Sequence, residues 1–193
     1  MIVIFGYSDK EKVTLLKDFF GRIKKEACFV DEGALSQTLA SILKGEGDFN
    51  YKPSKETAIL VSGEDREEVA GKVLSALSKG QIGFDHHILV EEEMLEKSLA
   101  DIFSEHSAHR AFIKRLAYLQ QLIDGTASLK EKDYDPDDWS ELKLAVANAN
   151  DYLDTLVNDY EDSSKLAIKD SEGLEKLVNA LRVAMKTLLE RKH

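Results

Sequence analysis

The chain has 193 residues, of which 43% are hydrophobic and 32% charged, and its formal net charge is −10 at pH 7. This composition is typical of folded globular proteins, and the acidic surplus excludes the positive charge that binding to DNA or RNA requires. No apolar run approaches the ~20 residues that span a bilayer, and Met1 leads into a strand-like run without a secretory signal. We therefore expect a cytoplasmic protein with no nucleic-acid and no membrane partner.

Short apolar runs alternate with helical patterns in the first 105 residues. The runs predict four strands, Ile2 to Phe5, Ala27 to Val30, Ala58 to Val61 and His87 to Val90. Uniformly apolar strands are typical of a sheet covered on both faces. Because strand-helix-strand crossovers are right-handed, we expect a four-stranded parallel sheet in which the second, first, third and fourth strands lie side by side in that order.

The sequence also predicts that the α/β half is an internally duplicated β-α-β-α unit. Residues 29 to 43 align with residues 89 to 103 without a gap, and six of the fifteen positions are identical. Packing does not require the acidic pair that follows the strand in both segments, so a true duplication is favoured over shared amphipathic periodicity. Residues 44 to 57 join the two copies.

The only cysteine is Cys28, which lies in an apolar run. A single cysteine excludes an intrachain disulfide and a metal site built on paired thiolates. We expect this side chain to be buried as a small apolar group.

Beyond Glu105 only helical patterns remain, and they predict three antiparallel helices. The second of these helices begins with Asp135 as N-cap and Pro136 at its first position, and Trp139 is predicted to face the core. We expect two domains, an α/β domain of residues 1–105 and an all-α three-helix bundle of residues 106–193. Residues 93 to 123 contain neither glycine nor proline, so one continuous helix is predicted to join them.

The α/β half carries a family resemblance on the segments Leu60-Val61-Ser62-Gly63 and Glu105-His106. With the helix between them, residues 58 to 105 resemble a bacterial family called domain of unknown function 3783, and residues 1 to 44 are the predicted second copy. The resemblance implies a strand, helix, strand and helix that end near an acidic residue and a histidine. It implies no known activity.

The C-terminal half carries a second resemblance, on the residues from Tyr134-Asp135-Pro136 through Trp139 to Ala149. An aromatic residue before a capped helix, a tryptophan in its first turn, and leucine and alanines on one face are similar to the start of the FIVAR module, a three-helix unit found in various architectures. The resemblance implies that fold and an accessory role, without a ligand.

Five residues follow the predicted strands and are candidate ligand-binding residues, because open α/β sheets bind ligands at the carboxyl ends of their strands. They are Tyr7, Asp31, Ser62, Gly63 and Glu91. A ligand would lie in a concavity between them, and the acidity of this edge favours a metal ion or an amine over a phosphate. The alternative interpretation is that the acidic side chains only provide favourable charge at the starts of helices.

Histidines provide the weak candidate metal ligands. His106 and His109 lie three residues apart in a predicted helix, and His86 and His87 precede the last strand, so a three-ligand site is conceivable. Histidines on a helix surface are the alternative interpretation. No nucleophile has a recognisable partner, and the chain lacks nucleotide-binding motifs, so we expect no catalytic residue and no cofactor.

The function predicted from the sequence is that of a non-catalytic bacterial accessory or protein-interaction protein, with the α/β half as platform and the bundle as docking module for an unidentified protein partner. The alternative is a small-molecule or metal-binding protein, which includes an enzyme, that uses the loops after the strands. The two differ in where the binding surface lies, across the bundle or in the concavity.

Overall fold

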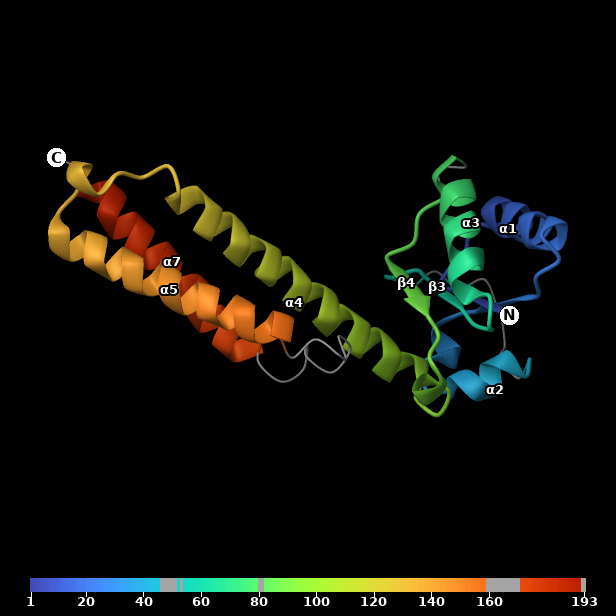
Figure 1. Ribbon diagram of the computed structural model, residues 1–193. Helices are drawn as coiled ribbons and strands as arrows, with labels where there is room; N and C mark the ends of the chain where they lie inside the picture. The colour runs from blue at the N-terminus through green and yellow to red at the C-terminus, as the bar shows by residue number, and fades with distance from the viewer. Residues whose placement is uncertain (46–51, 53, 80–81, 159–170, 192–193) are drawn as a thin grey trace. The chain divides into compact units, whose positions relative to one another are not determined.

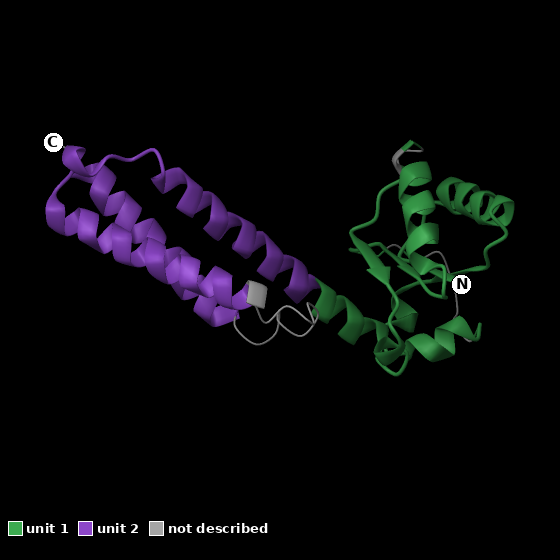
Figure 2. Ribbon diagram, viewed as in Figure 1, with its two compact units in different colours: residues 1–106 green, residues 107–193 purple. Residues whose placement is uncertain are grey.

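We describe the protein from a computed structural model. The structure describes residues 1–45, 52, 54–79, 82–158 and 171–191 (Figure 1). The chain divides into two compact units, Met1–His106 and Ser107–His193 (Figure 2).

The first unit alternates strands with helices. Its elements in order are β1 (Ile2–Phe5), α1 (Lys10–Arg22), β2 (Ala27–Val30), the 3₁₀ turn η1 (Glu32–Ala34), α2 (Leu39–Leu43), β3 (Ala58–Val61), α3 (Arg66–Lys79), β4 (His86–Leu89), the 3₁₀ turn η2 (Glu92–Met94) and the start of α4 (Leu99–Thr126). Three strands have the predicted bounds, and the fourth begins one residue earlier than predicted. An α/β unit followed by a helical unit is therefore confirmed.

The sheet is mixed, and the prediction of an all-parallel sheet was wrong. The strand order is β2-β1-β3-β4, as predicted. β1 is parallel to β2 and β3 is parallel to β4, but β1 and β3 are antiparallel, with Ile2 opposite Val61 and Phe5 opposite Ala58. The right-handed crossover rule gives the handedness of a connection between parallel strands and does not itself set strand direction. A helix between two strands, such as α2 between β2 and β3, therefore does not require β3 to be parallel to the first two strands.

Helices cover both faces of this sheet. α1 and α3 lie over one face, where Ile2, Ile4, Ile59 and Val61 form one buried cluster with the apolar sides of the two helices. On the other face, Val3, Phe5, Ala58 and Leu60 pack against α2 and the first turns of α4 (Figure 1). Burial on both faces is the physical reason that every residue of β1 and β3 is apolar.

The two segments that cover the second face are held together by reciprocal hydrogen bonds. Leu39 N donates to Lys97 O over 3.0 Å, and Leu99 N donates to Gln37 O over 3.2 Å. Ala40 N likewise donates to Leu95 O, and Ala100 N donates to Leu35 O. Thr38 and Ser98 form an antiparallel bridge at the centre. Each bond thus has a counterpart between the positions that the sequence alignment makes equivalent.

The second unit consists of helices. After α4 and the 3₁₀ turn η3 (Glu131–Asp133) come α5 (Pro136–Asn158) and α7 (Ser171–Glu190). Buried residues of α4, α5 and α7, such as Leu119, Leu142 and Leu181, form one cluster. Asp135 caps α5 as predicted, since its Oδ1 accepts from Asp137 N over 2.9 Å. Trp139 is half-buried against this cluster, so it is less buried than predicted.

Helix α4 is continuous through residues 104 to 107, but it begins at Leu99 rather than at residue 93. The residues before it form η2, and Ser98 Oγ accepts a hydrogen bond from Asp101 N over 3.2 Å at the start of the helix. Within the described ranges, no helix combines the length and apolar character needed to span a membrane.

Candidate functional site

The candidate ligand residues predicted from the sequence do not come together. Because β1 and β3 are antiparallel, β1 and β2 have their carboxyl ends at one end of the sheet, and β3 and β4 have theirs at the opposite end. Tyr7 and Asp31 follow the first pair of strands, while Ser62, Gly63 and Glu91 follow the second pair. The predicted concavity between all of them is therefore wrong.

Where β1 and β2 end, the candidate side chains stabilise the fold locally. Tyr7 Oη donates a 2.6 Å hydrogen bond to Gly83 O. Burial raises the pKa of the Tyr7 phenol, and the nearby carboxylates of Asp85 and Asp9 raise it further. Asp31 is only 3% exposed, and its Oδ1 accepts from Gly33 N over 3.0 Å at the start of η1. This contact fits the alternative interpretation, in which Asp31 is an acidic residue that stabilises the start of a helix.

Where β3 and β4 end, the candidate residues also make structural contacts. Ser62 Oγ donates to Met1 O over 3.0 Å and so links the start of β1 to the end of β3. Arg66 Nη2 donates to both carboxylate oxygens of Glu91 over 2.9 and 2.7 Å. Gly63 has a φ of 116°, a left-handed conformation that glycine adopts without strain. These contacts position the loop before α3.

The structure brings together two histidines that are 20 residues apart in the sequence. His86 Nδ1 lies 3.1 Å from His106 Nδ1, and His86 Nε2 lies 3.3 Å from Glu56 Oε2. The His86 ring is 4% exposed and stacks on Phe103, with ring centroids 5.5 Å apart and an interplanar angle of 8°. Both imidazoles belong to the first unit. We call His86, His106 and Glu56 the histidine cluster.

His106 and His109, the candidate metal ligands predicted from the sequence, both lie on α4, and His106 also contacts His86. In the described part of the chain, no group of three or more His, Cys, Asp or Glu side chains is arranged to hold a metal ion. The histidine cluster thus offers two imidazole nitrogens rather than the three-ligand site considered from the sequence.

An apolar groove lies between α3 and β4. Its cavity volume is about 190 Å³, and it is lined by Ile59, Val61, Ala70, Val73, Leu74, His87, Ile88 and Leu89. Leu74 and Leu89 are 43% and 37% exposed at the rim of this groove. We call this surface the β4 groove.

β4 is an edge strand of the sheet as described. His86 N and Val90 N donate to Thr57 O and Val61 O of the neighbouring strand segment. In a parallel pair the bonded residues alternate, so the peptide group of Leu89 is directed away from β3. This peptide group lies at the sheet edge, next to the β4 groove.

At the other edge strand, β2, the residue equivalent to Leu89 is covered. Phe29, the position that aligns with Leu89, is 6% exposed, and Lys17 Nζ of α1 lies 5.2 Å above its ring centroid. The same sheet face is thus covered at β2 and open at β4. Sequence reasoning missed the β4 groove, because Leu74 fits the apolar side of a buried helix and only the tertiary structure leaves it exposed.

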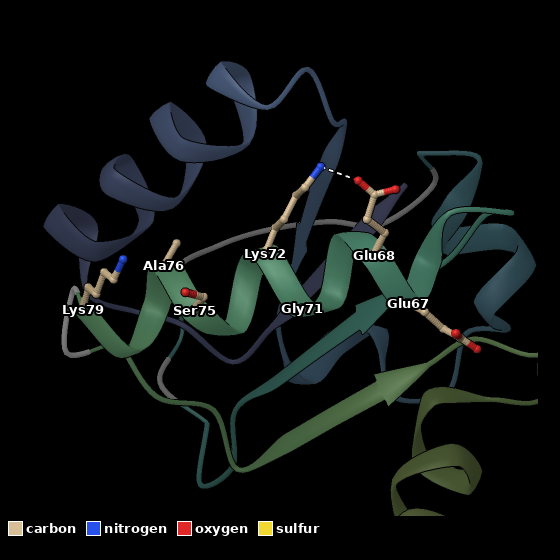
Figure 3. A pocket seen from close by; sticks show the side chains of 7 residues that line it. All are labelled: Glu67, Glu68, Gly71, Lys72, Ser75, Ala76 and Lys79. Atoms are coloured by element: carbon tan, nitrogen blue, oxygen red, sulfur yellow. Dashed lines mark hydrogen bonds and ion pairs between the residues drawn. The ribbon is translucent and has the colours of Figure 1, made fainter.

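A second, shallow surface lies along α3 and is lined by residues of that helix alone (Figure 3). Lys72 and Glu68 form an ion pair on its upper side in this view, and Glu67 projects on the side of β4. Small residues, among them Gly71 and Ala76, give the surface its hollow. It carries no converging functional side chains, so we do not assign it a site.

In the second unit, one buried carboxylate stands out. Asp138 is 6% exposed, and its Oδ1 accepts from Arg191 Nη1 over 3.2 Å. Its other oxygen and Trp139 Nε1 are buried and have no hydrogen-bond partner in the structure. The contact joins the start of α5 to the end of α7, which is a structural role.

No protein-family model matches the chain, and no curated protein or solved structure is significantly similar to it. The resemblances to domain of unknown function 3783 and to the FIVAR module therefore stay predictions. A functional proposal has to rest on the geometry of the β4 groove and of the histidine cluster.

Proposed function

We propose that the protein is a non-catalytic protein-interaction protein, and that its α/β unit binds an extended peptide segment of a partner along β4. One observation carries the proposal: the edge of β4 adjoins an open apolar groove of about 190 Å³. An added strand pairs its backbone with the sheet edge, which supplies affinity, while alternate side chains enter pockets and supply specificity.

The groove defines the central residue of the bound segment. It is lined by aliphatic side chains and His87, and Leu74 and Leu89 form its exposed rim. One large aliphatic or aromatic side chain of the added strand, directed to the face that carries α3, would cover both leucines. Burying apolar area contributes roughly 25 cal/mol per Å², so this side chain is the expected anchor of the segment.

Charge defines the ends of the segment. Asp85, which accepts hydrogen bonds from Thr57, precedes β4. Glu91, which is paired with Arg66, and the exposed Glu92 and Glu93 follow it. Acidic groups at both ends of the strand favour a segment with lysine or arginine at both ends. A second copy of β4 in antiparallel pairing would place Asp85 next to the partner's acidic run, which disfavours self-association. The proposed occupant is therefore a basic-flanked, apolar-centred strand of another protein.

A peptide display library of random sequences, selected on the full chain, tests the proposal. We expect the enriched sequences to alternate apolar and polar residues and to carry basic residues at both ends. The enriched peptide is then synthesised, and its affinity is measured by fluorescence polarisation. Leu89→Glu and Leu74→Glu should each weaken binding, because they place a carboxylate at the rim of the groove.

The matched control is Leu15→Glu, which changes an exposed leucine on α1 (59% exposed) by the same chemistry. This variant should bind the peptide as the wild type does. Equal affinity of the wild type, Leu89→Glu and Leu74→Glu would contradict the proposal, and so would selection of acidic or helical peptides.

We also propose that the first unit arose by duplication of one β-α-β-α unit. The reciprocal bonds of Leu39 N with Lys97 O and of Leu99 N with Gln37 O support it, because they relate positions that align in the sequence. The antiparallel pairing of β1 and β3 supports it too, because a twofold axis through the centre of that pair exchanges the two halves. Replacing residues 89–103 by the sequence of residues 29–43 should then give a chain that still folds cooperatively, and complete unfolding of this chimera would contradict the duplication.

The proposal assigns no ligand to the second unit. In the described part of this unit, exposed large apolar side chains lie on α4 (Ile113 and Tyr118), on α5 (Leu144) and on α7 (Val183 and Leu189). Isolated apolar side chains of this kind are ordinary on protein surfaces. The docking role that the sequence indicated for the bundle stays a prediction, and the α/β unit is the part that we propose binds the partner.

A further inference from the structure

We propose that His86 and His106 bind a divalent late transition-metal ion, with zinc as the reference ion, through their Nδ1 atoms, and that the Glu56 carboxylate orients His86 from outside the metal's first shell. The inference is independent of peptide binding at β4. It rests on the 3.1 Å separation of the two Nδ1 atoms and on the position of Glu56 behind His86.

The separation of the two nitrogens matches chelation of one ion. Imidazole nitrogens bind zinc at about 2.0–2.1 Å, so two of them on one ion lie roughly 3.3 Å apart at a tetrahedral angle and about 2.9 Å apart at a right angle. The observed 3.1 Å lies between these values.

Glu56 fixes the tautomer of His86 that metal binding needs. Its Oε2 lies 3.3 Å from His86 Nε2, so that nitrogen carries the proton and donates it to the carboxylate. The lone pair of His86 is then on Nδ1, directed at His106. A carboxylate that accepts from the far nitrogen of a ligating histidine is the usual outer partner in zinc sites, where it also raises the basicity of the ligand.

The His86 ring is held in this orientation from other sides as well. It is buried and stacks on Phe103, which limits its rotation. His106 is half-buried, so solvent reaches the pair from its side. Without metal, His106 Nδ1–H donates to His86 Nδ1. With metal, His106 carries its proton on Nε2 instead.

The ligand set selects the class of metal. Imidazole nitrogens suit zinc, copper, nickel and cobalt, whereas magnesium and calcium prefer oxygen ligands. In the described part of the chain, no group of three or more His, Cys, Asp or Glu side chains is arranged to hold a metal ion, so water completes the coordination. The site is thus an open, exchangeable one rather than a closed structural one.

Calorimetric titration of zinc into the untagged full chain tests the proposal. We expect saturable binding of one ion per chain. His106→Gln should abolish it, and Glu56→Gln should weaken it by about 10–100-fold, as loss of an outer carboxylate does elsewhere. His109→Gln and His87→Gln are the matched controls and should leave zinc affinity unchanged.

Nitrogen-15 NMR of the histidine side chains supplies a readout that does not depend on affinity. Zinc should shift the Nδ1 resonances of His86 and His106 and leave those of His109 in place. Absence of saturable binding by the wild type would overturn the proposal. Unchanged zinc affinity of His106→Gln would overturn it too, as would zinc shifts confined to other histidines, and circular dichroism of each variant separates these results from misfolding.

Discussion

Two buried leucines, Leu39 and Leu99, test how α2 and α4 pack on the second face of the sheet. Leu39 begins α2 and Leu99 begins α4, both are 0% exposed, and both belong to the cluster beneath the same sheet face. Each also donates its backbone N–H to a carbonyl just before the other leucine, Leu39 to Lys97 O and Leu99 to Gln37 O. We therefore expect Leu39→Ala and Leu99→Ala to have similar effects.

The magnitude follows from burial. Full burial of a leucine side chain contributes about 1.5–3 kcal/mol, and the cavity left by truncation brings the loss for Leu→Ala to about 2–5 kcal/mol. A domain of this size has a free energy of unfolding of roughly 5–15 kcal/mol. Either variant should thus lose a large fraction of the stability of the first unit.

Amide hydrogen exchange is the appropriate assay because it resolves the two units. The slowest amides of β1 and β3, at Ile4 and Leu60, should exchange faster in both variants by matching factors. Leu15→Ala is the control, since Leu15 is 59% exposed and surface changes of this kind stay within about 0.5 kcal/mol. The chain's single tryptophan, Trp139, lies in the second unit and reports on that unit separately.

A large loss for one leucine and less than about 1 kcal/mol for the other would refute this reasoning, because burial of that size does not permit it. It would mean that one of the two segments does not pack on the sheet as the structure has it.

Three further predictions follow from perturbed side chains. Burial raises the pKa of Tyr7 above its ordinary value of 10.0, so its contribution to stability is present below that pH and is lost as pH rises through the pKa of the folded state. The free energy of unfolding in urea should therefore fall between about pH 9 and 11. Tyr7→Phe should make this fall smaller, and the control Tyr118→Phe should leave it unchanged. A hydrogen bond from Lys25 lowers the pKa of Asp65 below its ordinary value of 3.8, so the contribution of this pair to stability is present above that pH and is lost on further acidification. In Lys25→Met the pKa of the Asp65 carboxyl, measured by carbon-13 NMR, should rise towards the ordinary value. Burial raises the pKa of the half-buried Cys28 thiol, so iodoacetamide at neutral pH should modify the folded chain more slowly than the urea-unfolded chain, and equal rates would contradict this.

The sequence predicted the elements of the first unit well, because each strand is a continuous apolar run and each main helix has a regular apolar face. It did not predict the direction of β3. A strand buried on both faces has the same residue pattern in either direction, so Ala58 to Val61 contain no signal that distinguishes parallel from antiparallel pairing with β1. The helices of the second unit were predicted for the same reason, from apolar spacing and the cap at Asp135.

The candidate sites were predicted less well, and the cause is the direction of β3. Because β3 and β4 run opposite to β1 and β2, Ser62 and Glu91 lie at the opposite end of the sheet from Tyr7 and Asp31, and the predicted concavity does not form. The histidine cluster depends on contacts between His86 and residues 20 and 30 positions away. Such contacts leave no local pattern, although both His86 and His106 had been considered as ligands.

Protection of single backbone amides shows directly whether β4 accepts an added strand. Hydrogen exchange is measured on the full chain with and without the peptide enriched by display. The amide of Leu89, which is directed away from β3, should become protected, while Ile88, whose amide already faces β3, should keep its exchange rate. Protection confined to the second unit, or an unchanged rate at Leu89 when the peptide is bound, would mean that no strand is added at β4.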